Sequence, residues 1–161
     1  MQILLTGFKD TSSEALVKSI NRHDRLILEN DKEKSVKQME QALQKGKYRY
    51  IFSFGQRPLI KNKIHIEDNA VVNGETLETV FDIAKLKKVF EDCGITVKLS
   101  HNAGTSYCNN IYYYGIKMIV KNDLNTKMVF IHIPYMKNIS DPVDFFYSIE
   151  KGIIKLLSEA V

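Results

Sequence analysis

The sequence predicts an α/β fold: a single three-layer α/β/α domain over residues 1–161, with a mainly parallel central sheet and helices on both faces. Runs that favour strands alternate along the chain with runs that favour helices, which is the element order of a parallel sheet connected by helices. The chain has no repeat, low-complexity tract or linker, and its length is sufficient to bury one core.

The first third of the chain contains three strand-like and two helix-like runs. A capping box at 11–14 opens the first helix, Asn30 and Asp31 can cap the second, and Gly46 ends it. The third strand is apolar enough to lie at the centre of the sheet. The predicted strands cover 2–8, 25–30 and 48–55, and the predicted helices cover 13–22 and 32–45.

The rest of the chain continues the alternation. The run "KIHIEDNAVV" alternates only in part, so it predicts either a hairpin or one added strand. Asp82 can cap the next helix, and Ser140 or Asp141 can cap the last one, with Pro142 in its first turn. The predicted strands cover 95–100 and 128–134, and the predicted helices cover 83–93, 104–122 and a segment from 142 onward.

Composition and charge exclude several classes of protein. The net charge of +4 comes from lysines interleaved with acidic residues, a pattern of solvated helix faces that does not indicate a nucleic-acid partner. The apolar runs are far shorter than the roughly 18 residues that cross a bilayer, and the start lacks the pattern of a signal peptide. Two cysteines are too few for a disulfide framework, so a cytoplasmic location is expected.

Ligands of parallel α/β sheets bind at the carboxyl ends of the strands. Four predicted loops meet that condition: "TGFKDTS", "FGQRP", "SHNAGTSYC" and the end of "FIHIP". Cys108 lies in the first turns of a predicted helix, where unpaired N–H groups and the helix dipole stabilise a thiolate and an oxyanion. The alternative is a core cysteine, because Cys108 shares one helical face with Ile111, Tyr112 and Ile119.

Two further side chains could complete a nucleophilic site. His132, near the end of its strand, could take the thiol proton and return it to a leaving amine, or it could be a hydrogen-bonded core histidine. Glu67 could orient His132, or it could be an exposed loop acid, and Asp68 competes for the same role. Cys93 precedes Gly94 at a helix end and reads as structural.

A zinc site is the other use of these residue types. Cys93, His101, Cys108 and His132 could serve as ligands, but no C-x-x-C or H-x-x-x-H spacing is present. We therefore expect no metal.

The segment "SHNAGTSYCNN" resembles the active-site motif S-x-x-A-G-T-x-x-C-N of cysteine-type pyroglutamyl peptidases, also called pyrrolidone-carboxylate peptidases. The block "FIHIPY" is similar to that family's F-x-H-x-P-Y, and the 24-residue separation of Cys108 and His132 also agrees (132 − 108). Weaker likenesses are "ILLTGF", "FGQ" and "IHIEDNAVVN". The resemblance spans nearly the whole chain and identifies it as one pyroglutamyl-peptidase-like domain.

The resemblance implies an enzyme that removes N-terminal pyroglutamyl residues from peptides through a Cys108–His132–Glu67 triad and a thioester. It implies substrate contacts from Phe8, Gln56 and Asn109. It also implies a cytoplasmic homo-oligomer that needs no cofactor and acts on peptides with a blocked N-terminus.

Three departures from the family pattern lie in substrate-pocket elements. "KDTSSE" replaces a P-F-G-G loop after "TGF", "RPLIKNK" follows the G-Q turn, and a short segment without arginine follows Asn73. Two alternatives therefore stay open: a related cysteine amidohydrolase with another N-acyl specificity, and a catalytically degenerate binding protein.

Overall fold

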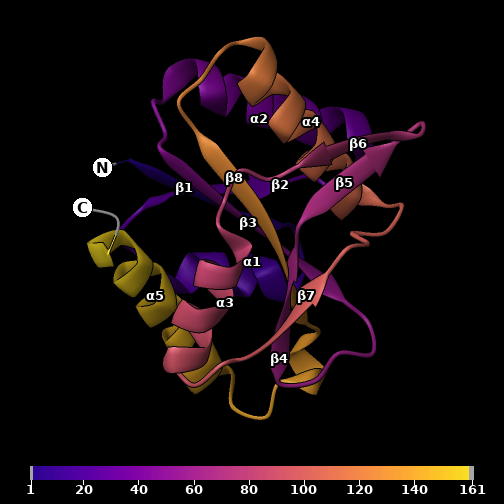
Figure 1. The fold of residues 1–161 in the computed structure, drawn as a ribbon. Helices are drawn as coiled ribbons and strands as arrows, with labels where there is room; N and C mark the ends of the chain where they lie inside the picture. Colours follow the sequence, from indigo (N-terminus) through magenta and orange to yellow (C-terminus); the bar gives the residue numbers. More distant parts are fainter. Residues whose placement is uncertain (1, 160–161) are drawn as a thin grey trace.

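The computed structural model describes residues 2–159 and confirms the predicted α/β fold with a mainly parallel sheet and helices on both faces (Figure 1). The six strands of the main sheet are β1 (Ile3–Phe8), β2 (Asp24–Leu28), β3 (Tyr50–Arg57), β4 (Lys63–Glu67), β7 (Thr96–Ser100) and β8 (Lys127–Pro134). The α-helices are α1 (Ser12–Ser19), α2 (Lys32–Lys45), α3 (Ile83–Asp92), α4 (Tyr107–Lys121) and α5 (Pro142–Glu159). A 3-10 turn, η1 (Met136–Asn138), precedes α5.

The strand order is β2-β1-β3-β8-β4-β7. The first four strands in this order are parallel, whereas β4 runs antiparallel to β8 and β7 runs parallel to β4. Because β4 is reversed, its carboxyl end lies beside the middle of β8, where Glu67 pairs with Phe130. This reversal brings a residue from the end of one strand next to the interior of another.

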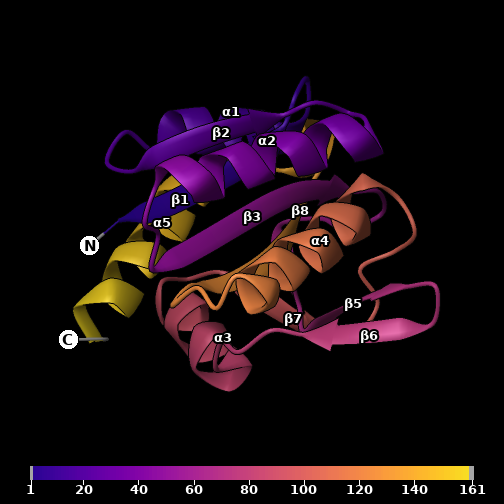
Figure 2. The same ribbon diagram turned by 90° about the horizontal axis from the view of Figure 1, so that it is seen from above.

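Each face of the sheet has its own apolar core. Helices α1, α3 and α5 pack on one face over the odd-numbered residues of β8, and α2 and α4 cover the other face (Figures 1 and 2). Side chains alternate between the faces of a strand. Met128 and Phe130 therefore point toward α4, whereas Val129 and Ile131 lie in the opposite core.

The predicted helix starts are found with specific caps. Thr11 accepts from the N–H of Ser13, and Asp31 and Asp82 cap α2 and α3 through their carboxylates. Of the two residues considered for α5, Asp141 caps it, because its Oδ1 accepts from the N–H of Asp144 at 3.1 Å.

The segment at 63–72 forms two strands that belong to different sheets. β4 joins the main sheet, while β5 (Asn69–Val72) pairs with β6 (Glu75–Glu78) in a separate hairpin that packs on α4 (Figure 2). The strand β6 was not predicted. The sequence signal for this hairpin is the Asn73-Gly74 pair, which is typical of two-residue hairpin turns. In the structure both residues have the positive φ that such a turn requires (51° and 79°).

Within residues 2–159, no helix is both long enough and apolar enough to cross a membrane.

Candidate active site

A cavity of about 490 Å³ lies where β1, β3 and β8 end and α4 begins. Each of the four loops that the sequence placed at strand ends contributes to it. Its lining consists of Phe8–Thr11, Asn30, Gln56–Pro58, Ala103–Cys108, His132 and Tyr135. A cavity of similar size, about 500 Å³, is lined by Leu43–Arg49 without Lys45 and by Asp123–Thr126, and it contains no cysteine or histidine.

Cys108 is the second residue of α4 and is half-buried at the cavity wall. Ser106 is the N-cap residue of α4. In the described part of the chain its side chain makes no capping hydrogen bond. The first N–H groups of the helix therefore keep free hydrogen-bonding capacity beside the sulfur, as an oxyanion would require.

The sulfur of Cys108 lies directly over Gly55 of β3. A Cβ atom at position 55 would collide with Sγ of Cys108 and would lie 2.8 Å from Cζ of Phe130. Gly55 is also the β3 partner of His132 on β8. Because Gly55 has no side chain, the thiol can lie directly over β3. Neighbouring strands are about 4.8 Å apart, so the thiol is one strand away from His132 on β8.

The pKa of the Cys108 thiol is raised to about 12, mainly by burial; the charge of Arg57 opposes this rise and the charge of Glu67 adds to it. The thiol is therefore protonated at neutral pH. The helix N-terminus alone does not produce a thiolate here, and attack on a carbonyl requires a base that takes the proton.

His132 is 3% exposed, and Glu67 is fully buried behind it. Nδ1 of His132 lies 2.9 Å from Oε1 of Glu67. A carboxylate at Nδ1 fixes the ring and leaves Nε2 as the nitrogen that can exchange a proton. Glu67 is thus a buried partner of His132. Its place on β4 explains the contact, because β4 lies next to β8, with His65 opposite His132 and Glu67 opposite Phe130.

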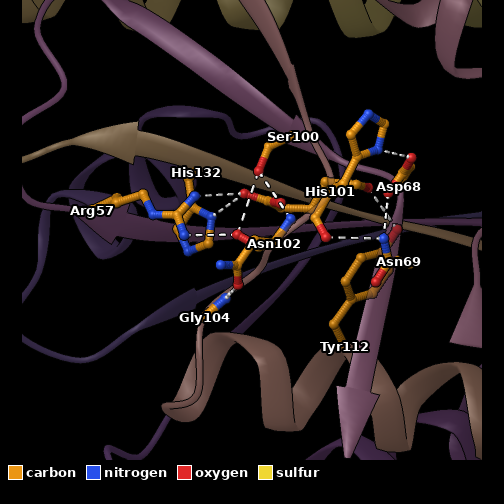
Figure 3. A network of polar contacts seen from close by, with 10 residues as sticks. Arg57, Asp68, Asn69, Ser100, His101, Asn102, Gly104, Tyr112 and His132 are labelled. Carbon is orange, nitrogen blue, oxygen red and sulfur yellow. Dashed lines mark hydrogen bonds and ion pairs between the residues drawn. The ribbon is translucent and has the colours of Figure 1, made fainter. Parts of the chain in front are cut away.

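Arg57, at the end of β3, was not singled out from the sequence. Its Nη1 donates to Oε1 of Glu67 at 3.0 Å, and its Nη2 donates to the carbonyl of Asn102 at 2.7 Å. Figure 3 shows Arg57 beside His132, with its contacts running to this polar network. The only sequence signal was an arginine directly after the G-Q turn, and its partners became visible only once β4 was placed.

Of the three residues expected to contact substrate, Phe8 and Gln56 line the cavity and Asn109 does not. Phe8 lines the cavity, and its ring centroid lies 6.3 Å from that of Tyr107. Gln56 also lines it, although its Oε1 accepts from the N–H of Ser12 at 3.0 Å.

Asn109 is not among the cavity-lining residues. Its Oδ1 accepts from the N–H of Val71 at 3.0 Å, and its Nδ2 donates to the carbonyl of Val71 at 2.8 Å. These two bonds tie β5 to α4. The structure therefore shows Asn109 holding the hairpin on α4. The substrate contact that the resemblance implies for Asn109 stays a prediction.

His65 is the β4 partner of His132 and is 7% exposed. Neither of its ring nitrogens has a hydrogen-bond partner among residues 2–159, and the same is true of Oε2 of Glu67. Burial, with the charge of Arg57 as the next cause, lowers the pKa of His65 to about 4. His65 is therefore neutral at physiological pH.

The sequence left two alternatives for these residue types: Asp68 as the partner of His132, and a zinc site. Asp68 accepts from the ring of His101, which is largely exposed, so Asp68 is engaged away from His132 (Figure 3). Across the described range 2–159, no three His, Cys, Asp or Glu side chains come together as metal ligands.

Comparisons with known proteins find one family of similar sequences. A family model described as "Pyroglutamyl peptidase" matches residues 63–144, half of the chain. The pyrrolidone-carboxylate peptidase of Brachyspira hyodysenteriae is 37% identical over 76 residues, which cover 47% of this chain and only 38% of that relative. The pyrrolidone-carboxylate peptidase of Fusobacterium nucleatum is 24% identical over an alignment that covers 96% of this chain and 97% of its own.

Solved structures show the same fold. A mutant pyrrolidone carboxyl peptidase from Pyrococcus furiosus superposes with a TM-score of 0.86 at 20% identity, covering 100% of both chains. Pyroglutamyl peptidase I of Bacillus amyloliquefaciens gives 0.84 at 20% identity, with 94% of each chain covered.

Proposed function

Because the chain belongs to the pyroglutamyl peptidase family, we propose that it is a cysteine hydrolase that releases N-terminal pyroglutamyl residues from peptides. The observation that carries the proposal is that Cys108 and His132 line one cavity while Nδ1 of His132 bonds the buried Glu67. Phe8 and Tyr107 supply an apolar wall for a neutral lactam ring in the same cavity.

In the proposed reaction, Sγ of Cys108 attacks the pyroglutamyl carbonyl carbon while His132 takes the thiol proton. The oxyanion is held by backbone N–H groups at the start of α4. The C–N bond then breaks, His132 gives its proton to the leaving amine, and a thioester remains. Water, deprotonated by His132, hydrolyses the thioester, and the thiol is restored. Glu67 stabilises the imidazolium that forms in both halves.

The test is hydrolysis of a pyroglutamyl aminocoumarin by the wild type, Cys108→Ala and His132→Gln. Cys93→Ala is the matched control, because Cys93 is also half-buried but lies at the end of α3, away from the cavity. Turnover that survives in the control and is lost in the other two variants supports the proposal. Equal turnover in Cys108→Ala and the wild type contradicts it.

A second candidate is hydrolysis of a different N-acyl group. The cavity is also lined by the charged residues Lys9, Asp10 and Arg57, which a neutral lactam does not need. A panel of N-acyl aminocoumarins distinguishes the two, because turnover of other acyl groups without pyroglutamyl turnover assigns the second specificity. Binding of acylated peptides without turnover of any of them would instead indicate a degenerate binding protein.

From the same family membership we propose that residues 1–161 act as one domain in the cytoplasm and assemble as a homo-oligomer. Sedimentation equilibrium tests the assembly, and a single species with the mass of one chain contradicts it.

A further inference from the structure

We propose that Arg57 is a positioning residue of this site: its guanidinium group holds the Glu67 carboxylate behind His132 and anchors the loop that leads to Cys108. The inference rests on the proposed function and adds a residue to it. The structural basis is one side chain with two partners, Oε1 of Glu67 at 3.0 Å and the carbonyl of Asn102 at 2.7 Å.

Glu67 needs a cation because it has no exposed surface. An ionised carboxylate costs several kcal/mol to bury unless it is paired and hydrogen-bonded. In the described part of the chain Oε1 of Glu67 accepts from His132 and Arg57, whereas Oε2 has no partner. Of the two donors, only Arg57 is charged throughout the catalytic cycle, since His132 must be neutral when it acts as the base.

The sheet topology puts Arg57 in position for this role. The strand order is β3-β8-β4, and Gly55 pairs with His132, so Arg57, two residues after Gly55, points to the same face. Its side chain therefore reaches across the strand that carries His132 to the carboxylate on β4. The side chain is a quarter exposed and also lines the cavity.

The second hydrogen bond of Arg57, to the carbonyl of Asn102, links Glu67 to the loop that leads to Cys108. Asn102 lies in the loop between β7 and α4, five residues before the start of α4 at Tyr107. A guanidinium is planar, so its two end nitrogens hold their acceptors in a fixed relation that a lysine ammonium cannot reproduce. Arg57 thus fixes the carboxylate of Glu67 relative to the loop that sets the start of α4.

The charge of Arg57 also acts on the thiol. Burial is the main cause that raises the pKa of Cys108, and Arg57 is the main group that opposes it. The charged residue Glu67, which also faces the thiol, acts in the other direction. Removal of the arginine charge should therefore make Cys108 harder to deprotonate.

The experiment compares Arg57→Gln, Arg57→Lys and the control Arg49→Gln. Arg49 precedes the other end of the same strand and is exposed. For each protein we would measure kcat and KM on pyroglutamyl aminocoumarin and the pH profile of kcat/KM. In a Cys93→Ala background we would also measure the rate of Cys108 alkylation by iodoacetamide at pH 8.

We expect Arg57→Gln to lower kcat by about 10- to 100-fold, the range typical of residues that orient a catalytic side chain through a hydrogen bond. The acid side of its pH profile should move to higher pH, and its rate of Cys108 alkylation at pH 8 should fall, because a higher thiol pKa leaves less thiolate at that pH. Arg57→Lys should give an intermediate kcat, because it keeps the charge and loses the fork. Arg49→Gln should match the wild type.

Wild-type kcat and an unmoved pH profile in folded Arg57→Gln would overturn the proposal. If that variant does not fold, wild-type kcat in Arg57→Lys would overturn it instead. If the wild type turns over no pyroglutamyl substrate, the proposed function fails while alkylation still decides the role of Arg57. A rate of Cys108 alkylation at pH 8 that Arg57→Gln leaves unchanged would then refute the role.

Discussion

Gly55→Ala offers the sharpest test of how the candidate nucleophile is held. The sulfur of Cys108 occupies the space that a side chain at 55 would fill. An added Cβ would lie 2.8 Å and 3.1 Å from two ring atoms of Phe130 and nearer still to the sulfur, whereas ordinary contacts are 3.4–4 Å. Something in this layer must therefore move.

The magnitude follows from these distances. The sulfur must shift by on the order of 1 Å to restore contact distance, and a misplacement of that size can reduce a rate about 100-fold. Overpacking a core by one methyl group costs about 1–3 kcal/mol of unfolding free energy. We therefore expect Gly55→Ala to fold with a modestly lower unfolding midpoint and to lose about 100-fold in kcat and in the rate of Cys108 alkylation.

The matched control is Gly115→Ala in α4, the helix that carries Cys108. Its Cβ would meet the end of Met128, a flexible side chain that can move aside, and Gly115 does not line the cavity. Urea unfolding, peptide hydrolysis and iodoacetamide labelling would be measured on both variants. A folded Gly55→Ala that keeps wild-type turnover and labelling, or a Gly115→Ala that loses both, would refute the reasoning.

Three further substitutions test other parts of the network. The pKa of His65 is about 4 in the folded protein against an ordinary 6.5, so the unfolded chain binds more protons between these values. Stability should fall as pH drops through this window, by at most roughly 3 kcal/mol. Urea titrations at pH 7 and 4 should show a smaller loss in His65→Leu, and an equal loss would contradict the assignment. Asn109→Ala should lower the free energy of unfolding by about 1–3 kcal/mol without changing KM, because it frees Val71. A raised KM at unchanged stability would instead support Asn109 as a substrate contact. Tyr112→Phe removes the buried 2.9 Å bond to the carbonyl of Glu67 and should cost about 1 kcal/mol in urea unfolding; an unchanged unfolding midpoint would mean that this bond contributes no stability.

Most elements of the fold were predictable because their signals are local. Caps at Thr11, Asp31 and Asp82, and the apolar strands between them, are read directly from neighbouring residues. The direction of β4 was not predictable in this way. Strand direction depends on which neighbour a strand pairs with, and β4 pairs with β8, which lies more than 60 residues later in the chain.

The sequence by itself determined the layer architecture, the four loops that form the cavity, and Cys108, His132 and Glu67 as the side chains to examine. Only the tertiary structure decided what surrounds them: Gly55 under the sulfur, Arg57 on Glu67, and Asn109 turned to the hairpin. The physical reason is that motif and periodicity act over a few residues. Charge pairing and steric fit instead depend on strand order and direction, which long-range burial and pairing decide.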